Sequence, residues 1–300
     1  MNWNNFLYGS PATDYIFQEM SYEEQIKLAS TYIKNADYIL IGAGAGLSSA
    51  AGLTYSGKRF EENFKEFIDK YGMTDMYSAG FYPFPSEEAR WGYWSKHSYI
   101  NRIEPEGLPL YRQLLKIIES KDYFVLTTNV DYQFQKSGFD ESRIFATQGD
   151  YGLIQCMHGC HNKTYDAIEM FNQMNQAVKD CLVPSYMVPK CPVCGGPMTM
   201  NLRCDQYFVE DEKWNIAADY FEKFLKTIKN KKIVLLELGV GFNTPAIIRF
   251  PFEKMMRENN NATLVRLNLD EAIVPKNFGK RAVGINEDLN KSISDLLERV

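Results

Sequence analysis

Apolar positions repeat along the chain in two alternating patterns. Residues 22–35 place Ile26, Ala29 and Ile33 on one helical face, and the apolar run at 37–41 that follows predicts a short buried strand. The alternation continues to the C-terminus, with helices expected over 109–120, 214–230, 244–259 and 289–300, and strands over 123–127, 144–147, 233–238 and 263–267. Apolar strands that alternate with helices predict an α/β fold, in which helices cover both faces of a parallel sheet.

Two stretches interrupt this alternation. Residues 54–103 are aromatic and polar, and predict a long loop with a small helical insertion. Residues 151–200 hold five of the six cysteines and predict an inserted module. The sequence therefore predicts a Rossmann-like domain formed by residues 1–150 and 201–300, and a separate module at 151–200.

The first predicted strand runs into a glycine-rich turn, LIGAGAGLSSAAG at residues 40–52. Gly42, Gly44 and Gly46 would let backbone N–H groups approach an anion such as a dinucleotide phosphate, at the start of a helix. The usual fingerprint is incomplete, because Leu47 stands at the third glycine position and no second strand ending in an acid follows. An ordinary dehydrogenase is therefore disfavoured, and a glycine turn without a ligand is the alternative.

Four cysteines have the spacing of a metal site. Cys156-x3-Cys160 and Cys191-x2-Cys194 form two pairs, and glycines follow the second pair. Four thiolates around one ion make a closed, structural zinc site. His158 and His161 could compete as ligands, and unliganded thiols are the alternative. The remaining Cys181 and Cys204 are expected to be buried apolar thiols.

Polar residues follow the next two predicted strands. Thr128-Asn129-Val130-Asp131 comes directly after the strand at 123–127, and Gln148 comes directly after the strand at 144–147. Ligand chemistry in a doubly wound sheet lies at the carboxyl ends of its strands. Asn129 or Asp131 could instead cap a helix N-terminus.

Composition excludes several classes of protein. The net charge of −5 argues against a general nucleic-acid binder, and no apolar run is long enough to span a bilayer. The N-terminus lacks the basic and apolar segments of a signal peptide, so a cytoplasmic protein is expected. Six cysteines in that setting favour metal binding or free thiols over disulfides.

In combination, these motifs resemble the sirtuins. Gly42-Ala43-Gly44 is similar to their opening glycine turn, and Thr128-Asn129-Val130-Asp131 to their Gln-Asn-Ile-Asp. Gln148-Gly149 falls where sirtuins have a catalytic His-Gly, and the four cysteines fall where they bind zinc. The resemblance implies that NAD is the ligand. The residues it implies at the NAD site are Gly42, Ala43, Gly44, Gly46, Tyr55, Gln148, Gly239, Val240, Gly241 and Asn268.

The departures from the sirtuin pattern indicate one branch. Thr54–Gly57 replaces the Pro-Asp-Phe-Arg of deacylating sirtuins, and Phe208-Val209-Glu210 replaces the Phe-Gly-Glu that pairs with an acyl-lysine peptide. These features resemble the macrodomain-linked (class M) microbial sirtuins. That resemblance implies protein ADP-ribosylation, with a lipoylated carrier similar to the glycine-cleavage H protein as acceptor and a macrodomain hydrolase as functional partner.

The substitution of histidine by Gln148 has a chemical consequence. Deacylation needs a base for a ribose hydroxyl, and a glutamine amide cannot accept that proton. Direct transfer to an already ionised acceptor needs no base. We therefore expect catalytic roles for Asn129 and Asp131 towards nicotinamide, and for Gln148 towards the ribose. Two alternatives are a deacylase that recruits another base and a non-catalytic NAD sensor.

Overall fold

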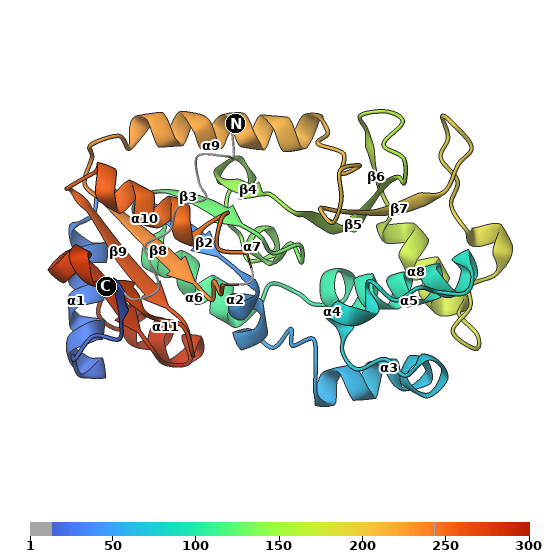
Figure 1. Ribbon diagram of the computed structural model, residues 1–300, viewed down its shortest axis with the longest axis horizontal. Coiled ribbons are helices and arrows are strands. Elements are labelled where there is room, and N and C mark those ends of the chain that lie inside the picture. The colour runs from blue at the N-terminus through green and yellow to red at the C-terminus, as the bar shows by residue number, and fades with distance from the viewer. Residues whose placement is uncertain (1–13, 243) are drawn as a thin grey trace.

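The computed structural model describes residues 14–242 and 244–300, and its centre is a six-stranded parallel sheet (Figure 1). The strand order is β11-β9-β8-β2-β3-β4, and every neighbouring pair is parallel. The strands are β2 (Tyr38–Ala43), β3 (Asp122–Thr127), β4 (Ile144–Ala146), β8 (Ile233–Leu238), β9 (Ala262–Leu267) and β11 (Ala282–Ile285). The predicted α/β class with a parallel sheet is confirmed.

Helices cover both faces of this sheet. Successive side chains of a strand point to opposite sides, and in these strands both sets are apolar and must be buried. Ile39 and Ile41 face one core with helices α1 (Tyr22–Asn35), α6 (Pro109–Ile118) and α11 (Leu289–Leu297). Leu40, between them, faces the other core with α9 (Glu212–Thr227) and α10 (Arg249–Glu258). Short helices α2 (Ala45–Ala50) and α7 (Gln133–Lys136) follow the ends of β2 and β3.

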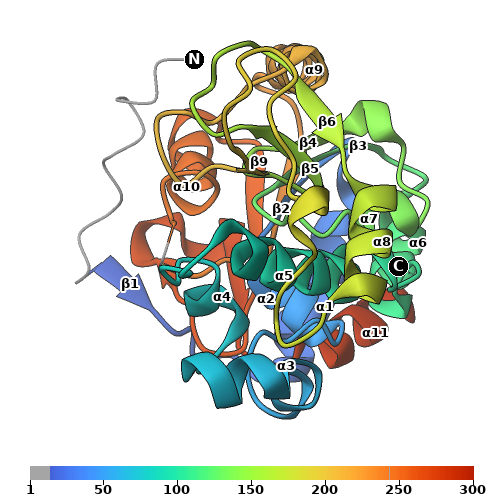
Figure 2. The same ribbon diagram turned by 90° about the vertical axis from the view of Figure 1, so that its right-hand side faces the viewer.

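The two interrupting stretches pack together as a second lobe, on the right of Figure 1 and facing the viewer in Figure 2. The first contributes α3 (Lys58–Tyr71), α4 (Met76–Ala79), α5 (Glu87–Ser98) and a π-helical turn at Tyr99–Ile103. The second contributes α8 (Ile168–Ala177) and an antiparallel sheet of β6 (Thr164–Asp166), β5 (Gly149–Cys156) and β7 (Met198–Leu202). One aromatic core, with Trp91 and Phe171 buried at its centre, joins them.

The remaining described elements are small. A two-stranded antiparallel ribbon pairs β1 (Tyr15–Ile16) with β10 (Val274–Pro275). Short 3-10 turns lie at Glu141–Arg143, Ser185–Met187 and Lys276–Arg281. Within the described residues, no helix is both long enough and apolar enough to cross a membrane.

Most predicted elements are present, with shifted ends. Helix α9 begins two residues earlier than predicted, because the Asp211 side chain accepts a hydrogen bond from the Trp214 backbone N–H (2.9 Å) and caps it. The helix predicted from residue 244 begins only at Arg249, because turns occupy residues 245–248 and Phe250 N–H bonds to the Pro245 carbonyl. Strand β11 was not predicted, since its four residues are too few to show a pattern.

Candidate active site

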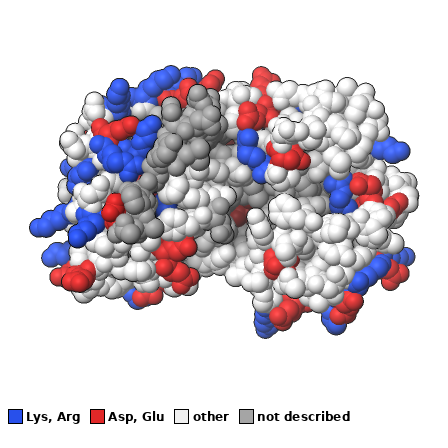
Figure 3. Space-filling model, viewed as in Figure 1, with Lys and Arg blue, Asp and Glu red and all other residues white. Residues whose placement is uncertain are grey.

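The site predicted from sequence lies where the order of the strands reverses. From β2 the chain moves outward through β3 to β4, and later returns to the other side of β2 as β8, followed by β9 and β11. Ligands of open α/β sheets bind at this switch point, outside the carboxyl ends of the strands. Strands β2 and β8 each end there in a glycine turn, at Gly44–Gly46 and Gly239–Gly241. In Figure 3 the surface is indented between the two lobes.

The two glycine turns pack directly against each other. Gly46 N–H donates to the Gly239 carbonyl (3.0 Å), and a Cβ on Gly46 would lie 2.7 Å from Gly239 Cα. Gly239 has φ +60°, a conformation that favours glycine. Gly42 has a different environment, because a Cβ there would lie 2.4 Å from an Ile248 methyl group on the α10 side of the sheet. Mutual packing therefore requires glycine at Gly46 and Gly239, whether or not a ligand is bound.

A buried polar cluster joins the first glycine turn to the end of β3. Ser48, on α2, donates to Asp131 Oδ2 and accepts from Asn129 Nδ2 (3.0 Å). The Tyr111 hydroxyl lies 2.9 Å from Ser48 Oγ and also accepts from Asn129 (3.3 Å). Asn129 and Asp131 are 8% and 4% exposed, so they are largely withdrawn from water. Sequence reasoning missed Ser48 and Tyr111.

The buried carboxyl of Asp131 is electrostatically unusual. Burial raises its pKa, while hydrogen bonds from Ser48 and from the Gln133 backbone N–H (3.0 Å) oppose that rise. The bond to Gln133, the first residue of α7, resembles helix capping, but the other carboxylate oxygen is directed to Ser48. Asn129 donates its amide protons to Ser48 and Tyr111 and caps no helix. Helix capping alone therefore does not explain the hydrogen bonds of Asn129 and Asp131.

Gln148 lies on the connection between the two lobes. Its side chain donates to Thr147 Oγ1 (3.1 Å), and its backbone carbonyl accepts from Arg203 N–H (3.0 Å). A cavity of about 20 Å³ lies between the end of β3 and the start of β5, and Asn129, Asp131 and Gly149 all line it. The structure thus brings Asn129 and Asp131 to the residue that follows Gln148.

Arg203 is a neighbour of Gln148 that sequence reasoning missed. Its guanidinium donates to the Thr147 carbonyl (3.2 Å) and pairs with Glu210 (2.5 Å). It also stacks over the Phe208 ring at 4.2 Å. The segment that departs from the sirtuin peptide-binding pattern therefore packs on an arginine beside Gln148.

Tyr55 belongs to a hydrogen-bonded aromatic cluster in the second lobe. Its hydroxyl lies 2.8 Å from that of Tyr151, and burial raises the pKa of Tyr55 to about 12. The Tyr151 ring packs edge-on against His97, which is fully buried and hydrogen-bonded to Tyr93 (3.0 Å). Burial lowers the pKa of His97 to about 3, so this imidazole is neutral at pH 7.

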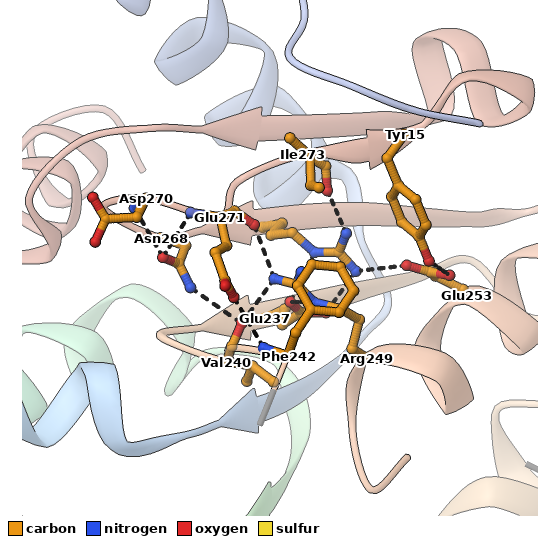
Figure 4. Close-up of polar contacts among 11 residues, drawn as sticks. Tyr15, Glu237, Val240, Phe242, Arg249, Glu253, Asn268, Asp270, Glu271 and Ile273 are labelled. Carbon is orange, nitrogen blue, oxygen red and sulfur yellow. Dashed lines mark hydrogen bonds and ion pairs between the residues drawn. The ribbon is translucent and has the colours of Figure 1, made fainter. Parts of the chain in front are cut away.

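The late turn after β8 is tied to the loop after β9, as Figure 4 shows. Asn268 Nδ2 donates to the Val240 carbonyl (3.1 Å), and its Oδ1 accepts from the backbone N–H groups of Asp270 and Glu271. The Phe242 N–H donates to the Glu271 carboxylate (2.9 Å). The side chain of Asn268, one of the residues predicted at the NAD site, therefore holds the two loops together.

A fully buried ion network supports this turn from behind (Figure 4). Arg249, on α10, pairs with Glu237 of β8 (3.2 Å) and donates to the Val240 carbonyl (2.7 Å). Arg266, on β9, pairs with Glu237 (2.7 Å) and with Glu253 (3.0 Å). Charged residues inside the otherwise apolar strands at 233–238 and 262–267 were a sequence signal for this network, and it was missed.

The four predicted cysteines converge on one point. Their sulfur atoms lie within 4.8 Å of one another, with Cys156–Cys194 at 3.7 Å and Cys160–Cys191 at 3.6 Å. Four thiolates at 2.3 Å around zinc would be about 3.8 Å apart, so the cluster fits a tetrahedral structural zinc ion. His161 Nδ1 lies 3.0 Å from Cys160 Sγ, beside the cluster. Of the other two cysteines, Cys181 is buried as predicted, but the prediction for Cys204 was wrong, because it is exposed.

Two proteins of similar sequence are named as ADP-ribosyltransferases. No protein-family profile matches the chain. It is 34% identical over 275 residues to a protein ADP-ribosyltransferase of Staphylococcus aureus, a match that covers 91% of this chain and 87% of that protein. It is 32% identical over 291 residues to a probable bifunctional ADP-ribose hydrolase/ADP-ribosyltransferase of Fusarium oxysporum, covering 91% of this chain and 48% of that protein.

Solved structures show the same fold. A crystal structure of a Sir2 homologue–NAD complex aligns with a TM-score of 0.59 at 15% identity, over 96% of this chain and 97% of that one. Sir2Tm bound to a propionylated peptide aligns with a TM-score of 0.57 at 18% identity, over 93% and 98%. The chain therefore has the fold of the Sir2 proteins. The chain belongs to the family of protein ADP-ribosyltransferases. NAD is its co-substrate, and its cluster of four cysteines fits a structural zinc ion.

Proposed function

We propose that this enzyme transfers ADP-ribose from NAD to a side chain of a protein acceptor and does not remove acyl groups from lysine. The observation that carries the proposal is that the polar cluster, all of whose members are described, contains no imidazole. The chain has three histidines. His97 is buried in the aromatic core, and His158 and His161 follow Cys156 in the zinc module. Gln148 can orient a ribose hydroxyl but cannot take its proton.

The same site suggests how NAD is held. We assign the pyrophosphate to the paired turns that contain Ala43, Gly44, Gly46, Gly239 and Gly241. Gly42 would support the first turn from within β2, where it leaves room for Ile248 and Phe252. The adenosine would then lie by Val240 and Asn268, and the nicotinamide by Asn129. Tyr55 would border the nicotinamide ribose. Domain roles follow this assignment, with 1–150 and 201–300 binding NAD, 151–200 holding zinc and 54–103 covering the site.

The chain's own groups have separate tasks in this scheme. Bound NAD supplies an electrophilic ribose carbon as nicotinamide leaves with the electron pair of the glycosidic bond. Asp131, held by Ser48 and the Gln133 N–H, would stabilise the positive charge that develops on the ribose. Asn129, fixed by Ser48 and Tyr111, would orient nicotinamide. The acceptor side chain then forms the new bond to the ribose carbon.

We propose a lipoyl-carrier protein, similar to the glycine-cleavage H protein, as the acceptor. The support is the resemblance to class M sirtuins and the departure of Phe208-Val209-Glu210 from the peptide-binding pattern. A macrodomain hydrolase as functional partner is supported by the fungal relative, whose name joins hydrolase and transferase in one chain. Six free thiols, four of them gathered for metal, favour a cytoplasmic setting.

The experiment is incubation with radiolabelled NAD and a lipoylated carrier, followed by mass spectrometry of the labelled band. We expect label on the carrier and release of nicotinamide. An unlipoylated carrier and Asn129→Ala enzyme serve as controls, and both should remain unlabelled. Loss of acyl groups from a peptide would favour the deacylase alternative, and NAD binding without nicotinamide release would favour a sensor.

A further inference from the structure

An apolar pocket of about 320 Å³ lies on the side of the sheet covered by α9 and α10. Its floor is formed by leucines from three neighbouring strands, and its walls by residues of the two helices. The lining includes Leu40, Leu126, Leu235, Phe221, Leu225 and Met255. Ligand sites are concave and mostly apolar, with a few polar groups that fix orientation, and this pocket has that composition.

The pocket is separate from the NAD site. Asn230, in the turn before β8, borders it, together with Ile233 and Ala262, the first residues of β8 and β9. These residues mark the amino ends of the strands, whereas the glycine turns and the polar cluster follow the carboxyl ends. None of the residues assigned above to NAD lines the pocket.

Two lysines and one glutamate lie at the mouth, so its charge is net positive. Lys229 and Lys254 border it, together with Asn230, Glu258 and Asn259. Glu258 lies 3.8 Å from Lys254, so the only acid among the described residues at the mouth already faces a lysine. Residues 223–236 contain five lysines and no acid. Figure 3 shows Lys and Arg gathered over this end of α9 and α10.

We propose that this pocket binds a straight-chain aliphatic carboxylate, with its alkyl chain between α9 and α10 and its head group beside Lys229. An apolar cavity with a basic mouth selects a molecule that has both a long apolar tail and one negative charge. A neutral hydrocarbon would leave the positive charge at the mouth uncompensated, and a small anion would leave the apolar walls exposed.

Helix α10 connects this pocket to the NAD site. Phe252 lines the pocket and also fills the space left by the missing Cβ of Gly42 in β2. Arg249, one turn earlier on the same helix, donates to the Val240 carbonyl of the late glycine turn (2.7 Å) (Figure 4). A ligand that presses on Phe252 should therefore shift the turn and change the KM for NAD. This coupling rests on the proposed function, whereas binding of the carboxylate does not.

The test measures binding of octanoate, decanoate and dodecanoate to the full chain by isothermal titration calorimetry. Each added methylene should tighten binding by about twofold at half burial, rising towards about fourfold per methylene if burial is complete. Decylamine has a similar tail and the opposite charge, and should bind weakly. Lys229→Glu should weaken decanoate binding, whereas Lys223→Glu, on α9 but outside the pocket, should not. Leu225→Glu, at a partly exposed wall position, should abolish it.

Several results would overturn the proposal. They are equal affinity for decylamine and decanoate, affinity independent of chain length, and unchanged binding in folded Lys229→Glu and Leu225→Glu proteins. A dimer that dissociates when decanoate is added would assign the pocket to a second copy of the chain instead. Decanoate binding with an unchanged KM for NAD would overturn the coupling through α10 while supporting the pocket.

Discussion

Ser48 donates a hydrogen bond to Asp131, although 83 positions separate the two residues in the chain. Ser48 lies on the helix after the first glycine turn, and Asp131 follows the neighbouring strand β3. The contact links the turn assigned to the pyrophosphate with the carboxylate assigned to the ribose.

Removing the Ser48 hydroxyl should disable the site without unfolding it. Ser48→Ala deletes a donor to a buried carboxylate, and we expect turnover to fall about 10²-fold, the scale of losing one well-placed donor. Because the Ser48 bond lowers the pKa of Asp131, its loss should also move the acidic limb of the pH–rate profile to higher pH. Ser49→Ala, at the exposed neighbouring position, is the control. An unchanged profile and rate in Ser48→Ala would contradict the assigned role.

Asp131→Asn should separate stability from activity. Burial raises the pKa of Asp131 in the folded state above its unfolded value of about 3.9. Such a carboxyl stabilises the fold below about pH 4 and loses that contribution as the pH rises through the folded-state pKa. The variant should therefore have a higher Tm than wild type at pH 7, with the difference closing towards pH 4, while nicotinamide release collapses. A lower Tm at pH 7 would refute this reasoning.

Zinc removal should damage the second lobe as a whole. Cys156 and Cys191 are buried in the same aromatic core as Trp91 and Phe171, so loss of the metal should spread from the cluster into that core. We expect about one zinc per chain by elemental analysis, and loss of both zinc and near-ultraviolet circular dichroism in Cys191→Ser. His158→Ala should retain its zinc if the ligands are the four cysteines. Loss of zinc in that variant would show that a histidine is a ligand.

Arg249→Met should weaken NAD binding through the late turn. It leaves Glu237 with one partner fewer and removes a donor from the Val240 carbonyl. Breaking a buried ion pair costs about 3–5 kcal/mol, so the Tm should fall. The KM for NAD should rise more than kcat falls, because no catalytic group is touched. Arg257→Met, exposed on the same helix, is the matched control. A fall in kcat with an unchanged KM for NAD in Arg249→Met would contradict a role in positioning the turn.

The local pattern of apolar residues was sufficient to predict most strands of the sheet. It was insufficient to predict the contacts that complete the candidate site. Strand β8 was predicted with its observed bounds because IVLLEL is buried on both faces and shows that pattern within six residues. Asn129 and Asp131 were identified because they follow a strand directly. Ser48 and Tyr111 were missed because their roles depend on the packing of segments 63 to 83 positions apart.

Other features were missed or mispredicted for reasons specific to each. Cys204 was predicted to be buried because free cysteines usually are, but it lies in an exposed loop after β7. Residues 54–103 contact the cysteine module through an aromatic core to which both segments contribute. The hydrophobic pattern of either segment alone does not reveal this contact. Charges within the strands, Glu237 and Arg266, could have revealed the ion network, because unpaired charges are not buried.

The most direct measurement is a side-by-side assay of wild type, Gln148→Ala and Gln148→His with NAD, on a lipoylated carrier protein and on an acetyl-lysine peptide. Wild type should modify the carrier and leave the peptide intact, and Gln148→Ala should transfer less because the bond that orients the ribose is lost. Gln148→His restores an imidazole but should still not deacylate, since the segment at 208–210 that would pair with the peptide is changed. Robust deacylation of the peptide by wild type would contradict the central claim.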